Sequence, residues 1–475
     1  MLDGPAVRSH LKASYFDTPE GSLARHGIVV RLRKEGMCWV QTAKGPTADV
    51  LERLEHNAEL RLQPSHAAPV IDLSRHRGTP IGKLIDKALS FEKNKTYPSL
   101  ALLYCTDIRR IVRQMTSGDS VVEVTLDQGI IFHGDHSQDV CELEIELKEG
   151  LPLDAINLAR KWCAAHGLWI SSISKSMKGQ RLNITSAKVC AKSPNLPTLP
   201  TFTRHATAQD MITSVVQACL NQILPNMSEL AWGSNSPAHI HQLRVGIRRL
   251  RTVFCDLGDL TCAPDPAWEV VLTRIFRILG THRDHSYLGL VLQPEWLLAG
   301  GPIIHFDSAG DAMPDLVRAL IAPEVQQTML GLLAFAHREA PQVFEKPGSL
   351  KKMMSKRLGK LHARALRDGN KFSDLGQAQR HHVRKRFKRL RYLVEFTAPL
   401  FVSRKAKSLL TAIRPLQDAL GAYNDEMIAF QALTGLASVD AKAWFGAGWL
   451  AARREPNTER CLQEIKKFAK LRPFW

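Results

Sequence analysis

A basic motif occurs twice in the chain, 140 residues apart, and it constrains the C-terminal part more than any other feature. The first copy consists of His241, Arg244, Arg248 and Arg251. The second copy repeats the same spacing with His381, Arg384, Lys388 and Arg391. Because an α-helix advances by about 100° per residue, this spacing places the four side chains of each copy along one stripe. Leu243, Ile247 and Leu250 fall on the opposite side. The pattern predicts two amphipathic helices related by internal duplication.

The positive charge of the chain is concentrated in the same part. The formal net charge is +18 over 475 residues. Residues 1–190 contain 25 Lys and Arg against 22 Asp and Glu, whereas the remainder contains 39 against 24. An excess of this kind predicts that the C-terminal part binds a polyanion.

Other features of the composition indicate a cytoplasmic protein. No apolar run is long enough to span a membrane, so we expect no membrane partner. The segment Met1–Pro5 lacks the basic and apolar pattern of a signal peptide. The nine cysteines show no paired or metal-finger spacing, which favours reduced thiols.

The N-terminal part reads as short strands with unusual charges. Val29, Arg31 and Arg33 share one face of a strand, and the run from Cys141 to Lys148 places three glutamates on one face. Aligned carboxylates repel one another unless cations intervene. Two interpretations stay open at this stage. The face is either a solvated side of an antiparallel sheet or one wall of a cavity that binds a metal ion and phosphate.

The chain divides into two domains of different class. Strand patterns fade after a segment with Pro194, Pro197 and Pro200, and helical periodicity follows to the end. We predict an α+β domain over 1–185 built on an antiparallel β-barrel, and a linker over 186–203. An all-α domain over 204–475 follows, a duplicated helical bundle with pseudo-repeats over about 204–340 and 341–475.

The N-terminal motifs resemble the CYTH superfamily of triphosphate tunnel metalloenzymes. They include the runs Tyr15–Pro19, Arg31–Arg33, Trp39–Gly45, Glu142–Glu146 and Ser174–Lys175. The resemblance implies a tunnel in which a divalent ion, Mg²⁺ or Mn²⁺, assists hydrolysis of inorganic triphosphate. It implies substrate binding by Arg31, Arg33, Arg53 and Arg110. It implies catalytic roles for Lys44, Glu55 and Lys175, and metal binding by Glu123, Glu142 and Glu144.

One motif of that superfamily is not found. Its members begin with a strand of the form Glu-x-Glu-x-Lys, which supplies carboxylates and a lysine to the tunnel. Here no glutamate precedes Glu20. Either this sequence is truncated at its N-terminus or the protein has lost that strand. In both cases we expect a tunnel that is open at one seam, with an unpaired strand edge and triphosphatase activity that is weak or absent.

The C-terminal part resembles the CHAD domain, a duplicated helical module associated with polyphosphate binding. Besides the two basic motifs, it carries the paired signals Leu279–Asp284 and Leu416–Asp425. The resemblance implies that inorganic polyphosphate is bound by His241, Arg244, Arg248, Arg251, His381, Arg384, Lys388 and Arg391. Nucleic acid is the rival ligand. Few aromatic residues accompany the basic ones, which leaves little for base stacking and favours a phosphate chain.

Two functions of different class remain open from the sequence. The chain is either a metal-dependent inorganic triphosphatase with a polyphosphate-binding domain, or a polyphosphate-binding protein with an inactive barrel.

Overall fold

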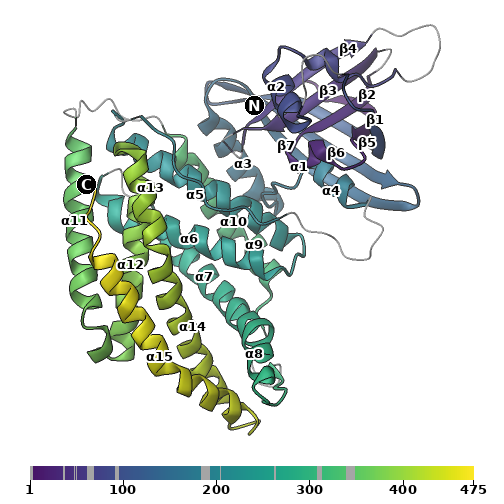
Figure 1. The fold of residues 1–475 in the computed structure, drawn as a ribbon. Helices are drawn as coiled ribbons and strands as arrows, with labels where there is room; N and C mark the ends of the chain where they lie inside the picture. The colour runs from purple at the N-terminus through teal and green to yellow at the C-terminus, as the bar shows by residue number, and fades with distance from the viewer. Residues whose placement is uncertain are drawn as a thin grey trace. The chain divides into compact units, whose positions relative to one another are not determined.

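The computed structural model contains two compact units, Met1–Ser193 and Pro194–Trp475, and each is described by itself (Figure 1). The structure describes residues 4–35, 38–47, 49, 51–60, 69–90, 96–182, 193–203, 205–260, 264–306, 313–338 and 348–475. The first part of the predicted linker and the predicted boundary between the pseudo-repeats lie outside these residues. The domain boundaries themselves stay predictions.

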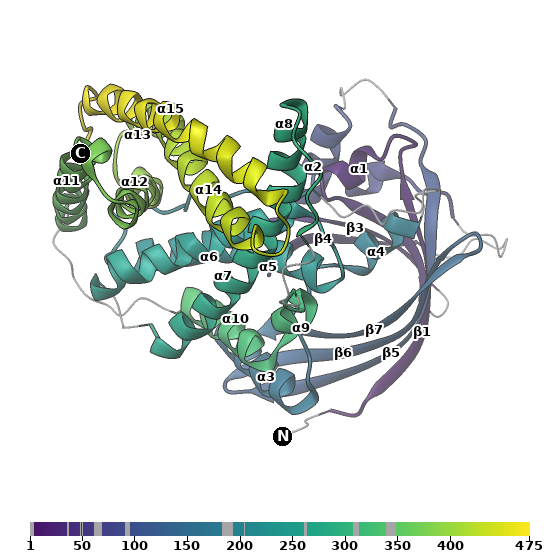
Figure 2. The same cartoon turned by 90° about the horizontal axis from the view of Figure 1, so that it is seen from below.

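The first unit is built on a seven-stranded antiparallel sheet in the order β4-β3-β2-β1-β5-β6-β7. The predicted antiparallel class is confirmed, and Figure 2 shows how strongly the strands β1, β5, β6 and β7 curve. Among the described strands, β4 and β7 form the two edges, so the sheet is a curled half-barrel with an open seam. The strands are β1 (Val7–Asp17), β2 (Val29–Glu35), β3 (Cys38–Pro46), β4 (Arg53–Leu60), β5 (Ala101–Ser117), β6 (Ser120–His133) and β7 (His136–Glu149).

Helices cover the sheet on both faces. The helix α3 (Pro152–His166) packs Leu158 against Val122 and Val124 of β6. Next to α1 (Ser22–Arg25), α2 (Pro80–Ala88) packs Ile81 and Ile85 in a cluster with residues of β2 and β3. On the opposite face α4 (Lys175–Leu182) contacts β5, β6 and β7. Gly179 of α4 is required there, because a Cβ atom would lie only 2.4 Å from the ring of Tyr104.

The second unit is helical. Its helices are α5 (Ala208–Ala231), α6 (Pro237–Leu257), α7 (Pro266–Tyr287), α8 (Gln293–Leu298), α9 (Leu316–Ile321), α10 (Pro323–Ala336), α11 (Ser349–Gly369), α12 (Gln377–Thr397), α13 (Ser403–Ala412), α14 (Arg414–Leu436) and α15 (Ala443–Ala469). None of the helices in the described part of the chain is both long and apolar enough to cross a membrane.

The two basic motifs lie on α6 and α12, as predicted, and these helices contact each other. Leu243, Ile247 and Leu250 of α6 are buried, which confirms the predicted apolar face of that helix. Two ion pairs of similar placement connect the helices. Arg249 of α6 lies 3.8 Å from Glu395 of α12. Arg389 of α12 pairs with Asp256 of α6. Arg389 corresponds to Arg249, because each lies eight residues after the histidine of its motif copy.

The described part of the predicted linker is attached to the helical unit. The backbone of Asn195 exchanges hydrogen bonds with the side chain of Asn226, and the backbone of Thr201 does so with Ser214. The carbonyl of Thr198 accepts a hydrogen bond of 2.7 Å from the buried guanidinium of Arg249. Residues 193–203 are therefore part of the packing around α5 and α6, and do not form a free spacer.

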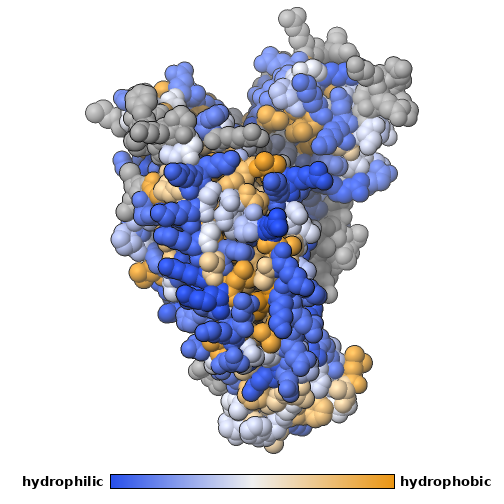
Figure 3. Space-filling model, turned by 60° about the vertical axis from the view of Figure 1, so that its left-hand side comes forward, coloured by the Kyte–Doolittle hydropathy of each residue, from blue (hydrophilic) through white to orange (hydrophobic). Residues whose placement is uncertain are grey.

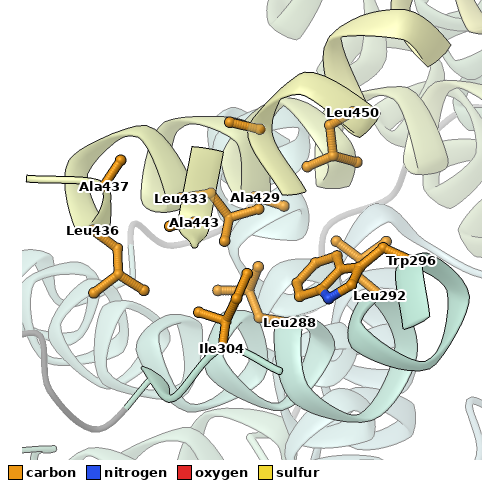
Figure 4. Close-up of a cluster of buried hydrophobic side chains, with 11 residues drawn as sticks. Leu288, Leu292, Trp296, Ile304, Ala429, Leu433, Leu436, Ala437, Ala443 and Leu450 are labelled. Carbon is orange, nitrogen blue, oxygen red and sulfur yellow. The ribbon is translucent and has the colours of Figure 1, made fainter. Parts of the chain in front are cut away.

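One hydrophobic core cluster of the helical unit lies where α8, α14 and α15 meet (Figure 4). Trp296 is fully buried there against Leu292 and Leu433, and its indole nitrogen donates to the carbonyl of Pro302. The chain reaches α8 through a π-helical turn, Leu288–Leu292, and Leu288 and Leu292 both belong to this core. Hydrophobic side chains also gather at the lower end of the face in Figure 3, where α8 and the turn before α15 lie in Figure 1.

Candidate functional site

Strand registers place the predicted tunnel residues on one face of the sheet, which we name the charged face. Residues directly opposite each other on antiparallel strands point to the same side. Arg33 lies opposite Ala13, Ala13 opposite Thr106, and Arg110 opposite Asp127. The charged members of this face include Arg31, Arg33, Lys44, Arg53, Glu55, Arg110, Glu123, Asp127, Glu142, Glu144 and Glu146.

Lys175 lies at the centre of the charged face. Its ammonium nitrogen is 2.8 Å from a carboxylate oxygen of each of Asp127, Glu142 and Glu144. Arg110 donates two hydrogen bonds, of 2.7 and 2.6 Å, to the carboxylate of Asp127. The helix α4 thus brings a lysine onto the carboxylates of β6 and β7.

Electrostatics keeps these groups ionised. Burial by itself raises the pKa of Asp127, but the Arg110 hydrogen bonds and the Lys175 ammonium outweigh it, so the pKa is lowered. Burial likewise acts to lower the pKa of Lys175, but Glu144, Glu142 and Asp127 raise it above its ordinary value. Lys175 and Arg110 carry two positive charges and the three carboxylates carry three negative ones, so this group has a net charge of −1.

Other predicted residues of the charged face are held in local pairs. Lys44 lies 2.6 Å from Glu55 across the β3–β4 pair. The guanidinium of Arg31 lies 3.5 Å from the hydroxyl of Tyr15. Burial acts to raise the pKa of Tyr15, but Arg31 and Lys175 lower it overall. Arg31, a predicted substrate-binding residue, and Lys175, a predicted catalytic residue, therefore both act on one buried tyrosine.

The structure does not bring all predicted residues to the Lys175 cluster. Glu123 lies four residues before Asp127 on β6, opposite Glu146, where it pairs with Lys148 at 3.2 Å. Arg53 begins the edge strand β4 and is exposed, opposite Pro46. Arg33 pairs with Glu35 of its own strand. These three positions share the face of the cluster but not its centre.

The charged face fits a divalent cation in its donor chemistry. Mg²⁺ and Mn²⁺ take oxygen ligands, and three carboxylates converge on one point. That point is held by the Lys175 ammonium. Within the described residues, no group of three or more His, Cys, Asp or Glu side chains is arranged to hold a metal ion. A metal ion would therefore need Lys175 to withdraw, or would bind carboxylate oxygens that Lys175 does not contact.

Sequence reasoning missed two residues of this site, Asp127 and Lys178. Asp127 is fully buried, and it lies beside Arg110 because of the β5–β6 register. Lys178 is one helical turn after Lys175 and pairs with Glu142. The alternation of β6 and the i, i+3 spacing on α4 were the available signals. Neither signal reveals that Arg110 of β5 lies beside Asp127 or that Glu142 of β7 lies beside Lys178.

The helical unit gathers cations from both motif copies, in a group that we name the central cation cluster. It consists of Arg244 and Arg248 of α6, Arg283 of α7, and Arg384 and Lys388 of α12. Asp425 of α14 provides the neighbouring carboxylate. It forms an ion pair with Arg283 and lies 3.7 Å from Arg384.

These cations affect one another strongly. Burial and the neighbouring Arg248 and Arg384 lower the pKa of Lys388 well below its ordinary value. Burial is also the main reason that the pKa values of Arg244 and Arg384 are lowered to about 10. Burial is the main cause of these shifts and the neighbouring cations add to it, so an anionic ligand would relieve the repulsion among the cations.

The ends of the two basic stripes are neutralised locally. Arg251 donates a hydrogen bond of 2.8 Å to Glu269. Arg391 donates to Glu395 at 2.7 Å and to Gln417 at 2.9 Å. The two histidines lie at the other ends of the stripes, and His381 is oriented by a contact of 2.6 Å with the Asn424 side chain. Arg283, Asn424 and Asp425 belong to the paired signals Leu279–Asp284 and Leu416–Asp425, but the sequence did not assign them to the binding site.

Comparison with known protein families agrees with this arrangement. A model of the CYTH domain matches residues 3–179, and a model of the CHAD domain matches residues 214–434. The chain carries a CYTH domain followed by a CHAD domain. The predicted resemblance is thereby confirmed for both parts.

Individual relatives are distant. An inorganic triphosphatase of Haemophilus influenzae is 28% identical over 171 residues, which cover 36% of this chain and 45% of the relative. The match therefore spans less than half the length of that protein. An uncharacterised protein of Mycobacterium tuberculosis is 23% identical over 485 residues, covering 96% of this chain and 88% of the relative. The crystal structure of the CHAD domain from the plant Ricinus communis is 24% identical, with a TM-score of 0.49, and covers 59% of this chain and 97% of that chain.

Proposed function

We propose that the CYTH domain hydrolyses inorganic triphosphate with the help of Mg²⁺ or Mn²⁺, and that the CHAD domain binds inorganic polyphosphate. The observation that carries the first part is the charged face, on which arginines and lysines alternate with carboxylates around Lys175. Phosphoanhydride hydrolysis depends on charge neutralisation and alignment more than on covalent chemistry, and this face offers both kinds of charge.

Most residues of the charged face have a role in the proposal. Arg31, Arg33 and Arg110 bind the phosphate oxygens, with Arg53 at the edge strand. Lys175 moves from its carboxylates to the phosphates when substrate enters, while Lys44 and Glu55 position the attacked end. A divalent ion held by Glu142 and Glu144, with Asp127 nearby, would supply further charge neutralisation at the phosphate oxygens. Glu123, also expected as a metal ligand, lies opposite Glu146 and is too far along β6 to share that ion.

Hydrolysis is tested by phosphate release from inorganic triphosphate by the full chain, with and without Mg²⁺ or Mn²⁺. Glu144→Gln should lower the rate by about 10²-fold or more, since it removes one charge from the site. Glu149→Gln on the same strand, which is exposed, is the matched control and should leave the rate unchanged. Equal rates for the two variants would contradict the proposal.

A second function is favoured by a specific observation. The sheet is open between β4 and β7 in the described residues, and its carboxylates are already paired with Lys175. A chain that releases no phosphate under either metal, but binds polyphosphate, would be a polyphosphate-binding protein with an inactive CYTH domain. The hydrolysis assay and the binding assay together separate the two functions.

Polyphosphate binding rests on the central cation cluster. Neutralising two of its members with the double variant Arg384→Gln/Lys388→Gln should weaken binding about 10-fold or more and reduce the dependence of affinity on salt. Arg404→Gln/Lys405→Gln on α13 removes the same charge from exposed positions and is the control. Loss of affinity that is equal in both double variants would show that net charge, not this cluster, attracts the ligand.

A further inference from the structure

A cavity of about 360 Å³ lies in the helical unit between α12, α14 and the 3-10 turn Phe372–Asp374. Its size is within the range of small-molecule sites. Of the residues that line it, none is acidic, and three are basic: Arg380, His381 and Arg384.

The rest of the lining is unsuited to a bare phosphate chain. Phe372 is fully buried and Tyr423 nearly so, and they meet edge to face with their ring centroids 5.4 Å apart. Leu420 and Ile428 add further apolar surface. An inorganic polyphosphate has no apolar group that would gain from contact with these side chains.

Amide side chains complete the cavity. Gln377 and Gln431 line it from α12 and α14, together with Asn424. Amides both donate and accept hydrogen bonds, so they suit a heterocycle that carries donors and acceptors on its edge. Apolar side chains next to amides suit a nucleobase, which has apolar faces and a polar edge.

The basic residues of the cavity are held in place by contacts on one side. Arg380 donates to the Tyr423 hydroxyl at 2.6 Å and to the Ser373 carbonyl at 2.7 Å, and it lies 5.3 Å from the centroid of Phe372. The Nε atoms of Arg380 and Arg384 are buried and have no hydrogen-bond partner among the described residues. A buried N–H group without a partner is costly, and a ligand oxygen would remove that cost.

The cavity and the central cation cluster share Arg384. This residue lines the cavity and lies 3.7 Å from Asp425, which is paired with Arg283 of the cluster. A ligand that places an organic group in the cavity can therefore extend its phosphates directly onto the cluster.

The corresponding position of the first motif copy is used differently. Arg244, the counterpart of Arg384, lies 4.7 Å from the ring centroid of Phe276 and donates to the carbonyl of Leu279. The α14 position that corresponds to Phe276 is Gln417, whose amide bonds to the backbone of α12. Arg244 thus stacks on Phe276 of the neighbouring helix α7, whereas Arg384 faces an open cavity. The two ends of the cluster are chemically distinct.

We propose that the cavity binds the base and ribose of a nucleoside triphosphate, whose phosphates lie on the central cation cluster. This inference rests on the proposed anion-binding function of the CHAD domain and names a ligand class for it. The base lies against Met427, Ile428 and the amides, and Arg384 bridges the sugar end to the phosphates.

The test is competition against fluorescent long-chain polyphosphate on the full chain. ATP should displace the polyphosphate at a concentration about tenfold lower than inorganic triphosphate does, because only ATP has a base that can enter the cavity. Ile428→Trp and, separately, Gln431→Trp fill the cavity. Each should abolish the difference between ATP and triphosphate while leaving polyphosphate affinity unchanged.

The control is Ala432→Trp, an exposed position of α14 outside the cavity, which should preserve the difference. Equal competition by ATP and triphosphate in the unmodified chain would overturn the inference and leave polyphosphate binding intact. A difference that persists in both filled variants would overturn it as well. Absence of polyphosphate binding would instead refute the proposed function on which the inference rests.

Discussion

Asp425 of α14 forms an ion pair with Arg283 of α7, and this pair joins the region of the first basic motif to that of the second. The same carboxylate lies 3.7 Å from Arg384 of α12. Its side chain is only 13% exposed, so the interaction is poorly screened by solvent. Burial acts to raise the pKa of Asp425, but Arg283 and Arg384 lower it overall. Asp425 is thus an internal anion within a site proposed to bind anions.

Asp425→Asn should therefore strengthen polyphosphate binding. The substitution keeps the shape of the side chain and removes a negative charge that repels the ligand. We expect about three- to tenfold tighter binding at low salt, with a smaller gain at high salt. Fluorescence polarisation at several salt concentrations measures it.

Asp418→Asn, an exposed position on the same helix, removes the same charge and is the control. A variant that remains folded and binds no more tightly than this control would show that the ligand does not approach Asp425.

Polyphosphate binding should take up protons near neutral pH. Desolvation, followed by the charges of Arg283, Arg248 and Lys388, lowers the pKa of His241 below its usual value. For His381, desolvation lowers the pKa and the contact with Asn424 opposes it only in part. Both imidazoles are then largely neutral at pH 7. A bound polyanion offsets the surrounding cations and raises these pKa values.

The sign of the pH dependence follows from this shift. Between the low pKa values of the free protein and the higher values of the complex, the complex holds more protons, so affinity rises as pH falls toward 6. Calorimetry in two buffers of different ionisation enthalpy measures the proton uptake directly. His241→Gln/His381→Gln should remove most of it. Uptake that is unchanged in this double variant would assign the protons to other groups, such as Lys388.

The buried Arg249 should be a major contributor to the stability of the helical unit. It is fully buried, donates to Gln222 at 3.0 Å and to Thr198 at 2.7 Å, and faces Glu395. Arg249→Met leaves these acceptors without their donor, which we expect to cost about 3 kcal/mol of unfolding free energy. Urea denaturation followed by circular dichroism of the helices gives the value.

Arg277→Met on α7 is the control for this measurement, because Arg277 is exposed. It should change the unfolding free energy by less than about 0.5 kcal/mol. A similar small effect for both variants would mean that the buried ion pair contributes no net stability.

Local patterns were sufficient to predict which faces carry charge. The alternation of Glu142, Glu144 and Glu146 and the helical spacing of His241, Arg244 and Arg248 are properties of single elements, and the structure has them as expected. Patterns of this kind follow from the periods of strand and helix alone.

Partners across elements could not be predicted in the same way. Asp127 acquires its role because β5 and β6 pair in the register that sets it opposite Arg110. Arg251 belongs to the same stripe as Arg248, but Glu269 of α7 neutralises it. Register and helix packing are set by the whole core, so no single stretch of sequence contains them.

Lys175 should act as a built-in cation that a divalent ion can replace. Three carboxylates, those of Asp127, Glu142 and Glu144, each lie 2.8 Å from its ammonium nitrogen. Lys175→Met leaves them facing one another without that charge, and like charges at this distance are strongly unfavourable. We expect the metal-free variant to lose about 2–4 kcal/mol of unfolding free energy.

Mn²⁺ should restore much of this loss, because the freed carboxylate oxygens are the ligands that it prefers. Thermal unfolding with and without Mn²⁺ measures the effect, and the increase in melting temperature on adding Mn²⁺ should be larger for Lys175→Met than for the unmodified chain. Lys161→Met, at an exposed position of α3, controls for the lost charge and should respond to Mn²⁺ as the unmodified chain does. If Mn²⁺ stabilises Lys175→Met no more than this control, the three carboxylates do not form a metal site even when the lysine is gone, and the divalent ion proposed for triphosphate hydrolysis must bind elsewhere.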